Sequence, residues 1–346
     1  MSLHILDAMA REGFEQVAAI HDRRSGLRAF IGVHDTVRGP AFGGIRRREY
    51  RDEREALFDC LRLSRAMTYK AALLDLPAGG GKIVLMDDEA VDWEAAYGHI
   101  GDVVERFGGT FYTGPDVNTG PIELGYVAER TRFVTDPGDA GPGELAEATA
   151  EGVFMGMAAA LRTRFGETAW PERKVVVQGL GAVGEGIARR VAARGAQVVG
   201  ADIDAERAEQ VADRLSIDLV DPSVAVEEPC DVFSPNAFGG LLHDLSLGRL
   251  ACKVIAGGAN NQLARMLVGD ELHDMGILYT PDFVINAGAL IRGTVFHLEQ
   301  RREPVEAIGL RIGAVTERIL ERAAEEDDAP ARVAIRLAEE RIEGWR

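Results

Sequence analysis

Two lysines and one aspartate have residue types and spacings that suit acid–base chemistry on a small substrate. Lys70 closes an amphipathic run, and Lys82 lies twelve positions further on, directly after three glycines. A lysine next to glycines is closely approached by backbone and suits a pocket for a small anionic or carbonyl group. Asp116 lies in the turn sequence GPDVNT, and nearby lysines would keep its carboxylate ionised and ready to exchange a proton.

Each of these segments also has a purely structural interpretation. The GGGK run at 79–82 fits a tight turn before a strand, and Asp116 fits a turn former that satisfies its own backbone. A phosphate-binding P-loop is excluded, because Leu76 stands where its first glycine belongs and Ile83 where Ser or Thr should follow the lysine. The rest of the chain decides between the two interpretations.

A dinucleotide-binding pattern stands in the second half of the chain. An apolar run at 174–178 predicts a buried strand, GLGAVG follows it directly, and a helix is expected over 185–194. Here Gly179 and Gly181 would let the backbone turn and approach a pyrophosphate. Gly184 would allow close packing of helix on strand, and the helix N-terminus would attract the phosphates.

Further residues are expected on the cofactor side. Asp202 follows Gly179 by 23 positions and would accept hydrogen bonds from the ribose hydroxyls, which favours NAD; Arg207 nearby leaves some use of NADP open. The loops SPNAFGG and AGGANNQL follow strand-like runs, and open parallel sheets bind ligands at the carboxyl ends of their strands. Asn236 and Asn260 therefore belong near the cofactor, with turn or cap chemistry as the alternative.

The elements that position these residues follow from periodicity and turn residues. Helices are expected over 1–18, 53–69, 92–107 and 144–164, and short strands over 27–35, 83–86 and 108–113. The segment 135–143, rich in Gly and Pro, is the best candidate for a linker. The chain from 301 to 346 is charged and reads as helical, with a break at 327–330.

Composition excludes several classes of function. The 346 residues have a formal net charge of −17, which disfavours nucleic acid and membranes as partners because both attract a basic face. The three cysteines are odd in number and far apart, which indicates a reducing, cytoplasmic compartment. No apolar run approaches about 18 residues, the N-terminus does not read as a signal peptide, and the histidines lack metal-ligand spacing. Neither a membrane span nor a metal site is expected.

Several motifs, in order along most of the chain, resemble those of the Glu/Leu/Phe/Val dehydrogenase family, most closely its leucine and phenylalanine dehydrogenase branch. The matching pieces are GPAFGG (39–44), MTYK (67–70), GGGK (79–82), YTGPDVNT (112–119), GLGAVG (179–184), SPNA (234–237), AGGANNQL (256–263) and PDFVINAGA (281–289). The resemblance implies an α/β fold with a cleft between two domains. Residues 1–134 and 323–346 would form an N-terminal substrate-binding and oligomerisation domain, and 135–322 a Rossmann-type NAD-binding domain.

The resemblance also implies an activity and residue roles. A homo-oligomer would convert an amino acid to its 2-oxo acid with NAD. Lys70 would hold the substrate α-carboxylate, Lys82 would polarise the carbonyl or activate water, and Asp116 would move the proton to and from the amino group. Thr149 resembles the residue that binds the nicotinamide amide, and Asn260 one that touches substrate and nicotinamide ribose. The other expected cofactor contacts are Gly179, Gly181, Ala182, Val183, Gly184, Asp202, Asn236 and Ala237. The other expected substrate contacts are Phe42, Gly43, Gly114, Leu290 and Gly293.

Substrate choice is expected to favour large apolar side chains. Phe42 stands where glutamate-specific relatives have a lysine that pairs with the substrate side chain, so glutamate would be left unpaired. Gly114 and Leu290 resemble phenylalanine dehydrogenases, while Asn118, Arg292 and Gly293 depart from the leucine enzymes. A non-catalytic NAD-binding regulator is the alternative, but it would be expected to lose one of the two lysines or Asp116. A 2-hydroxy-acid dehydrogenase would need a histidine with an acidic partner, and no motif suggests one.

Overall fold

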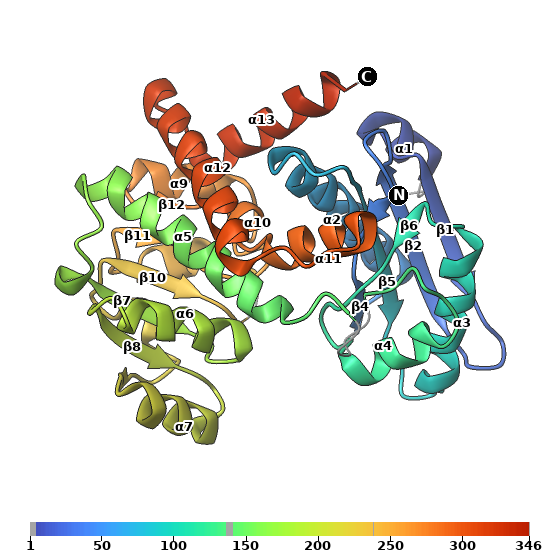
Figure 1. The fold of residues 1–346 in the computed structure, drawn as a ribbon, viewed down its shortest axis with the longest axis horizontal. Coiled ribbons are helices and arrows are strands. Elements are labelled where there is room, and N and C mark those ends of the chain that lie inside the picture. The colour runs from blue at the N-terminus through green and yellow to red at the C-terminus, as the bar shows by residue number, and fades with distance from the viewer. Residues whose placement is uncertain (1–4, 136–140, 238, 346) are drawn as a thin grey trace. The chain divides into compact units, whose positions relative to one another are not determined.

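The chain divides into two compact units, which are described separately (Figure 1). The computed structural model describes residues 5–135, 141–237 and 239–345. Unit 1 comprises the described parts of 1–143, 293–302 and 339–346, and unit 2 comprises those of 144–292 and 303–338. The expected linker at 135–143 lies largely outside the described residues. The domain boundaries expected from the sequence stay a prediction.

Unit 1 is built on a mixed sheet with the strand order β1-β2-β5-β3-β6, and β4 pairs with β5. The strands are β1 (Gln16–His21), β2 (Arg28–Asp35), β3 (Ala41–Phe42), β4 (Ile45–Arg48), β5 (Gly79–Met86) and β6 (Phe111–Tyr112). β2 runs antiparallel to both β1 and β5, whereas β3 and β4 are each parallel to β5, and β3 is also parallel to β6. The helices are α1 (Ile5–Glu12), α2 (Glu53–Leu73), α3 (Trp93–Arg106) and α4 (Pro121–Ala128).

Strand β5 is buried along its whole length because helices cover both faces of the sheet. Its side chains alternate: Ile83 and Leu85 pack in a core with residues of α3 and α4, while Val84 and Met86 pack with residues of α2. Helix α2 begins where expected, because Asp52 caps it by accepting a hydrogen bond of 2.9 Å from the Glu55 amide. It runs four residues beyond the predicted end, through Lys70 to Leu73.

The three glycines before Lys82 belong to strand β5, so the interpretation as a tight turn is wrong. A Cβ atom on Gly80 would lie 2.1 Å from the Thr68 amide nitrogen in α2, and one on Gly79 would lie 1.6 Å from the Asp35 carbonyl oxygen. Only a strand without side chains can lie this close to its neighbours. At the N-terminus the expected helix over 1–18 is too long, because α1 ends at Glu12 and β1 begins at Gln16.

Unit 2 is built on a parallel sheet with the order β12-β11-β10-β7-β8-β9, the order typical of dinucleotide-binding folds. Its strands are β7 (Lys174–Gln178), β8 (Gln197–Ala201), β9 (Asp218–Leu219), β10 (Val232–Pro235), β11 (Val254–Ile255) and β12 (Leu278–Tyr279). The α-helices that begin in this unit are α5 (Leu145–Phe165), α6 (Ala182–Ala192), α7 (Ala205–Leu215), α8 (Asp244–Leu247), α9 (Leu267–Asp274), α10 (Asp282–Ile285), α11 (Gly288–Glu299), α12 (Val305–Glu326) and α13 (Pro330–Glu343). Two short 3-10 helices cover Trp170–Glu172 and Ala225–Glu227. Helices α11 and α13 each end in unit 1.

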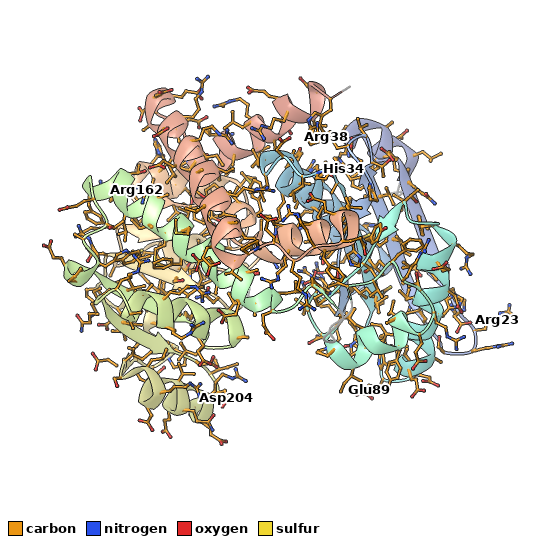
Figure 2. The ribbon with its side chains drawn as sticks, in the orientation of Figure 1. Arg23, His34, Arg38, Glu89, Arg162 and Asp204 are labelled. Atoms are coloured by element: carbon orange, nitrogen blue, oxygen red, sulfur yellow. The ribbon has the colours of Figure 1, made fainter. Side chains whose placement is uncertain are left out.

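Exposed charged side chains such as Arg23, Glu89 and Asp204 point away from the fold (Figure 2). His34, by contrast, is buried, and its ring bonds to the Thr68 hydroxyl at 2.8 Å. No helix in the described part of the chain is long and apolar enough to cross a membrane. Among the same residues, no group of three or more His, Cys, Asp or Glu side chains could hold a metal ion.

Candidate active site

Three parallel strands of unit 1 position the expected catalytic and substrate residues, two of them at or just after a carboxyl end and Lys82 within its strand. Phe42 ends β3 and pairs with Gly80 of β5 on one side and Tyr112 of β6 on the other. Lys82 lies in β5, two residues after that pairing, and Asp116 follows β6 by four positions. The carboxyl ends of parallel strands are the usual place for a ligand site in an α/β fold.

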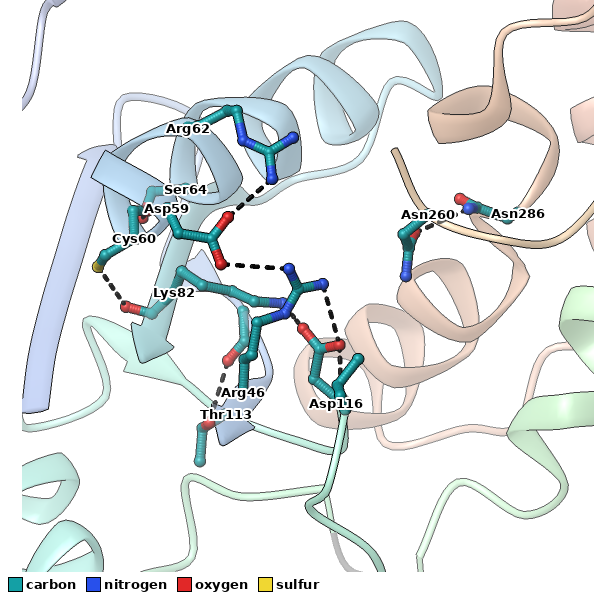
Figure 3. A network of polar contacts seen from close by, with 12 residues as sticks. Arg46, Asp59, Cys60, Arg62, Ser64, Lys82, Thr113, Asp116, Asn260 and Asn286 are labelled. Atoms are coloured by element: carbon teal, nitrogen blue, oxygen red, sulfur yellow. Dashed lines mark hydrogen bonds and ion pairs between the residues drawn. The ribbon is translucent and has the colours of Figure 1, made fainter. Parts of the chain in front are cut away.

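Lys82 and Asp116 form a buried ion pair between Nζ and Oδ2 (Figure 3). Their side chains are 7% and 6% exposed, so water screens the pair poorly and each charge acts strongly on the other. The pairing brings together a lysine and an aspartate that the sequence placed in separate motifs. It gives one site both a cation and a carboxylate that can hold a proton.

Arg46 is a second buried cation beside Asp116, and sequence reasoning assigned it no role. Its guanidinium lies 3.5 Å from Asp116 Oδ1 and 3.3 Å from Asp59 Oδ2, so it bridges the two carboxylates (Figure 3). Asp59 in turn accepts hydrogen bonds from the Tyr50 hydroxyl at 2.9 Å and from Arg62 at 2.7 Å. The signal that could have found Arg46 is its place at the end of the glycine-rich loop 38–46.

This network sets the charge state of Asp116. Burial alone would raise the pKa of its carboxyl group, but the charge of Lys82, followed by that of Arg46, outweighs burial and holds the pKa well below its usual range. Asp59 behaves alike: burial opposes ionisation, while Arg46, Arg62 and Tyr50 lower its pKa overall. Both aspartates are therefore ionised at neutral pH.

The turn that carries Asp116 is held by its own hydrogen bonds. Asp116 Oδ1 accepts the Val117 amide at 2.7 Å, and the Thr119 amide bonds back to the Asp116 carbonyl at 3.0 Å. Asn118 has φ = 55°, a left-handed conformation that asparagine tolerates better than most residues, and its side chain donates to the Arg47 carbonyl. Asn118 thus fits the backbone conformation of this turn.

Asp59→Asn is expected to lower the free energy of unfolding by about 3 kcal/mol at pH 7, because Arg46 keeps only one of its two carboxylates. The folded-state pKa of Asp59 is depressed, so its contribution is present above the unfolded pKa of about 3.9 and is lost as pH falls through the lower folded value. The difference between variant and parent should therefore narrow below about pH 4. Denaturant unfolding of variant and parent at pH 7 and below about pH 4 measures this difference in the free energy of unfolding.

The matched control for this prediction is Asp88→Asn. Asp88 pairs with Arg28 at 3.4 Å, but both side chains are nearly half exposed. An exposed pair contributes about 0–1 kcal/mol, so this variant should unfold almost as the parent does. Equal losses in the two variants would contradict the bridging role of Asp59.

Lysine is rare in this chain, which makes its two buried lysines informative. The four lysines are Lys70, Lys82, Lys174 and Lys253, whereas arginine supplies the other 35 basic residues. Lys70 lies in α2 and Lys82 in β5, and both are buried. Lysine is a compact charge that can give up its proton, which arginine does not. Because both side chains are buried, Lys70 and Lys82 are better suited to binding or proton transfer than to keeping a surface hydrated.

The expected substrate residues of unit 1 lie on or beside the same strands. Phe42 is buried and stacks on Tyr112, with ring centroids 4.9 Å apart and an interplanar angle of 5°. Gly43 follows it, and its backbone lies against Gly81 in β5. Gly114 and Gly293 both face Thr135. Leu290 is buried in the unit 2 part of α11.

The glycine-rich loop of unit 2 joins β7 to α6. Helix α6 begins at Ala182, three residues before its predicted start, so the helix N-terminus lies inside the motif. A Cβ atom on Gly184 would lie 1.8 Å from the Gly179 carbonyl oxygen. Only glycine at position 184 therefore lets the helix pack this closely on the loop. A Cβ atom on Gly181 would meet nothing within 4 Å, which leaves the loop open to a ligand. Ala182 and Val183 form the first turn of α6.

Asp202 directly follows strand β8 and is hydrogen-bonded to this loop. Its Oδ2 accepts the Leu180 amide at 2.6 Å, and its Oδ1 accepts the Asp204 amide at 2.9 Å and lies 3.5 Å from Arg207. The open glycine loop and the N-terminus of α6 would fit the pyrophosphate of a dinucleotide. The Asp202 carboxylate would fit its ribose hydroxyls.

The remaining expected cofactor residues lie in two strand-end loops and in helix α5 of unit 2. Asn236 accepts the Gly258 amide at 2.7 Å and donates to the Ser234 carbonyl at 2.8 Å, so it joins two strand-end loops; Ala237 follows it and is exposed. Asn260 accepts a hydrogen bond of 2.8 Å from Asn286. Thr149 is buried in α5, and its hydroxyl donates to the Leu145 carbonyl.

The chain is similar to several known proteins. Residues 15–133 match the family described as Glu/Leu/Phe/Val dehydrogenase, dimerisation domain. A leucine dehydrogenase of Thermoactinomyces intermedius is 37% identical over 99% of this chain and 95% of its own length. A valine dehydrogenase of Streptomyces albus is 37% identical over 98% and 95%. The crystal structure of L-tryptophan dehydrogenase from Nostoc punctiforme is similar with a TM-score of 0.83 and 35% identity, over 99% of both chains.

Proposed function

Because this chain belongs to the Glu/Leu/Phe/Val dehydrogenase family of amino-acid dehydrogenases, we propose that it uses NAD to deaminate an apolar L-amino acid oxidatively. The products are the 2-oxo acid, ammonia and NADH, and the reaction is reversible. The observation that carries the proposal is the buried ion pair between Lys82, within β5, and Asp116, in the turn after β6. A carboxylate held beside a lysine is the acid–base pair that this reaction needs.

The residues of unit 1 account for the steps on the substrate. Lys70 holds the α-carboxylate, and loss of hydride from the α-carbon leaves an iminium. Lys82 assists the addition of water to that carbon and stabilises the oxygen that becomes the carbonyl. Asp116 takes a proton from the water and returns it to the nitrogen, which leaves as ammonia.

Unit 2 is proposed to hold the cofactor. When bound, the nicotinamide supplies the hydride acceptor for the reaction. The loop 179–184 and the N-terminus of α6 hold the pyrophosphate, and Asp202 accepts hydrogen bonds from the ribose. Thr149, Asn236, Ala237 and Asn260 contact the remaining parts of the cofactor.

Selection for apolar side chains is proposed to rest on Phe42. A substrate carboxylate placed against the stacked rings of Phe42 and Tyr112 would lose its hydration without gaining a cation, which costs several kcal/mol. Leucine, valine and aromatic side chains incur no such cost. Gly114, Leu290 and Gly293 are proposed as further contacts of the substrate side chain.

Asp202→Ala is expected to weaken NAD binding about 10-fold or more relative to NADP. A hydrogen bond to a charged group is worth about 1.5–3 kcal/mol, and NADP cannot use this carboxylate because of its 2′-phosphate. The variant also loses the bond from the Leu180 amide, which affects both cofactors alike. The readout is therefore the ratio of the two dissociation constants, measured by titration.

Asp213→Ala is the control, because Asp213 is an exposed acid of the same unit. It should leave the ratio unchanged. An equal weakening of NAD and NADP in Asp202→Ala would remove the assignment of NAD as the preferred cofactor.

A homo-oligomeric assembly is proposed from the family description alone, which names the matching region a dimerisation domain. Sedimentation at micromolar concentration tests it, and a monomer would contradict it.

The proposed function itself is tested by NADH formation from NAD and single L-amino acids at alkaline pH. Leu, Val, Ile, Phe, Trp and Glu are compared in parallel. Turnover of one or more apolar members with little of Glu supports the proposal. If none of these amino acids gave NADH although NAD still bound, a non-catalytic NAD-binding regulator of the same fold would be favoured.

A further inference from the structure

One face of helix α11 continues beyond the expected substrate residues. Gly293 lies on this helix, and His297 stands four positions on, which places it one turn further along the same face. The imidazole Nε2 lies 3.4 Å from the hydroxyl of Thr135. Gly293, Thr135 and His297 all belong to unit 1, as do Phe42 and Gly114.

Two glycines make room for the Thr135 hydroxyl. A Cβ atom on Gly114 would lie 3.1 Å from Thr135 Oγ1, and one on Gly293 would lie 3.7 Å from it. The hydroxyl thus occupies space that side chains at these two positions would otherwise take. A polar pair, Thr135 with His297, therefore lies among residues expected to contact an apolar substrate.

The His297 ring also completes an aromatic wall. Its centroid lies 4.9 Å from that of Tyr112 and 6.1 Å from that of Phe42, which are stacked on each other. Phe133 contacts Tyr112 edge-on, and Phe296 contacts His297 in the same manner. A cavity of about 600 Å³ lies beside this wall and is lined by Tyr112, Phe133, Phe296 and His297 together with Ala128, Thr131, Arg132, Val134 and Gln300. Its size is that of an ordinary small-molecule pocket.

His297 is neutral under working conditions. Burial disfavours the imidazolium and lowers the pKa of His297 to about 4. A neutral imidazole has one hydrogen-bond donor and one acceptor, and it brings no charge into an apolar site. It can therefore accept a hydrogen bond from a ring substituent of a substrate without the desolvation cost of an ion.

We propose that His297, together with Thr135, is a specificity-determining residue that selects aromatic amino acids whose ring carries a hydrogen-bond donor, an indole N–H or a phenol O–H. The proposal rests on the proposed function, since it names the substrate class of that same site. The aromatic wall holds the ring, and the polar pair meets its donor. Leucine and phenylalanine carry no donor for this pair, so they gain no hydrogen bond from it.

The test compares kcat/KM for Trp, Tyr, Phe and Leu in the parent and in His297→Phe, which keeps a ring and removes the hydrogen bond. The parent is expected to prefer Trp or Tyr over Phe. In the variant that preference over Phe should fall about 10-fold, while kcat/KM for Phe and Leu stays within about 3-fold. Retained turnover of Phe and Leu in the variant also establishes that it is folded.

His273→Phe is the matched control, because His273 is a partly exposed histidine of α9 paired with Asp327. It should leave all four values unchanged. Three results would overturn the inference while leaving the proposed function intact: a parent that prefers Phe or Leu, a preference unchanged in His297→Phe, or an equal loss on all four substrates. A parent that oxidises no amino acid would overturn both.

Discussion

Lys82→Ala is expected to reduce turnover about 10³-fold or more while binding of NAD persists. Lys82 is a buried cation held on Asp116, and removing one preorganised group that stabilises developing charge costs about 10²–10³-fold in rate. The same change also removes the partner that positions the acid–base group. The measurement is kcat with the best apolar amino acid, together with an NAD titration by tryptophan or NADH fluorescence.

The fold should survive this substitution, because Asp116 keeps Arg46 at 3.5 Å. Lys253→Ala is the matched control: Lys253 pairs with Asp231 and is half exposed, so turnover should stay near the parent value. If Lys82→Ala lost NAD binding along with turnover, Lys82 would belong to the cofactor site and its role here would be wrong.

Asp116→Asn is expected to lower kcat about 10³-fold with little change in shape. General acid–base catalysis contributes about 10²–10⁴-fold, and an amide cannot take up the proton that this reaction moves. Activity across the pH range decides the role. If Asp116 is the acid–base group, the variant should lose activity at every pH; a rate within about 10-fold of the parent would point to another base.

Asp75→Asn is the control for Asp116→Asn, because Asp75 is an exposed partner of Arg38 and should tolerate the amide.

The low pKa of Asp116 also bears on how it acts as a base. Lys82 and Arg46 together hold it low, which makes the carboxylate a weak base in the free protein. A substrate that draws Lys82 onto its own oxygen would relieve one of the two cations and raise the proton affinity of Asp116. Arg46 would then be the residue that limits the rise.

The parts of the fold that could be predicted are those with local signals. The strand, glycine loop and helix around 174–192 follow from a short apolar run, fixed glycines and the distance to Asp202, and the structure has each of them. Helix α2 follows from apolar spacing and the Asp52 cap. The family motifs identified a dehydrogenase of amino acids, and the relatives agree.

The parts that could not be predicted depend on contacts between distant segments. The glycines of β5 are predicted as a turn because glycine has no side chain to reveal the alternation of a strand. Glycine is required there because α2 and Asp35 lie too close for a side chain. Arg46 and Asp59 meet only because β4 pairs with β5, next to α2. His297 reaches Tyr112 and Phe42 only through the placement of α11, which no local pattern encodes. The roles of the individual site residues stay predictions until variants are assayed.

The most direct test of the account follows the fate of the nitrogen. The purified protein is given NAD and its best apolar L-amino acid, and NADH, ammonia and 2-oxo acid are measured in the same reaction. The account predicts that all three appear in equal molar amounts and that Lys82→Ala forms all three about 10³-fold or more slowly. NADH formed without ammonia, or no NADH from any apolar amino acid while NAD remains bound, would contradict it.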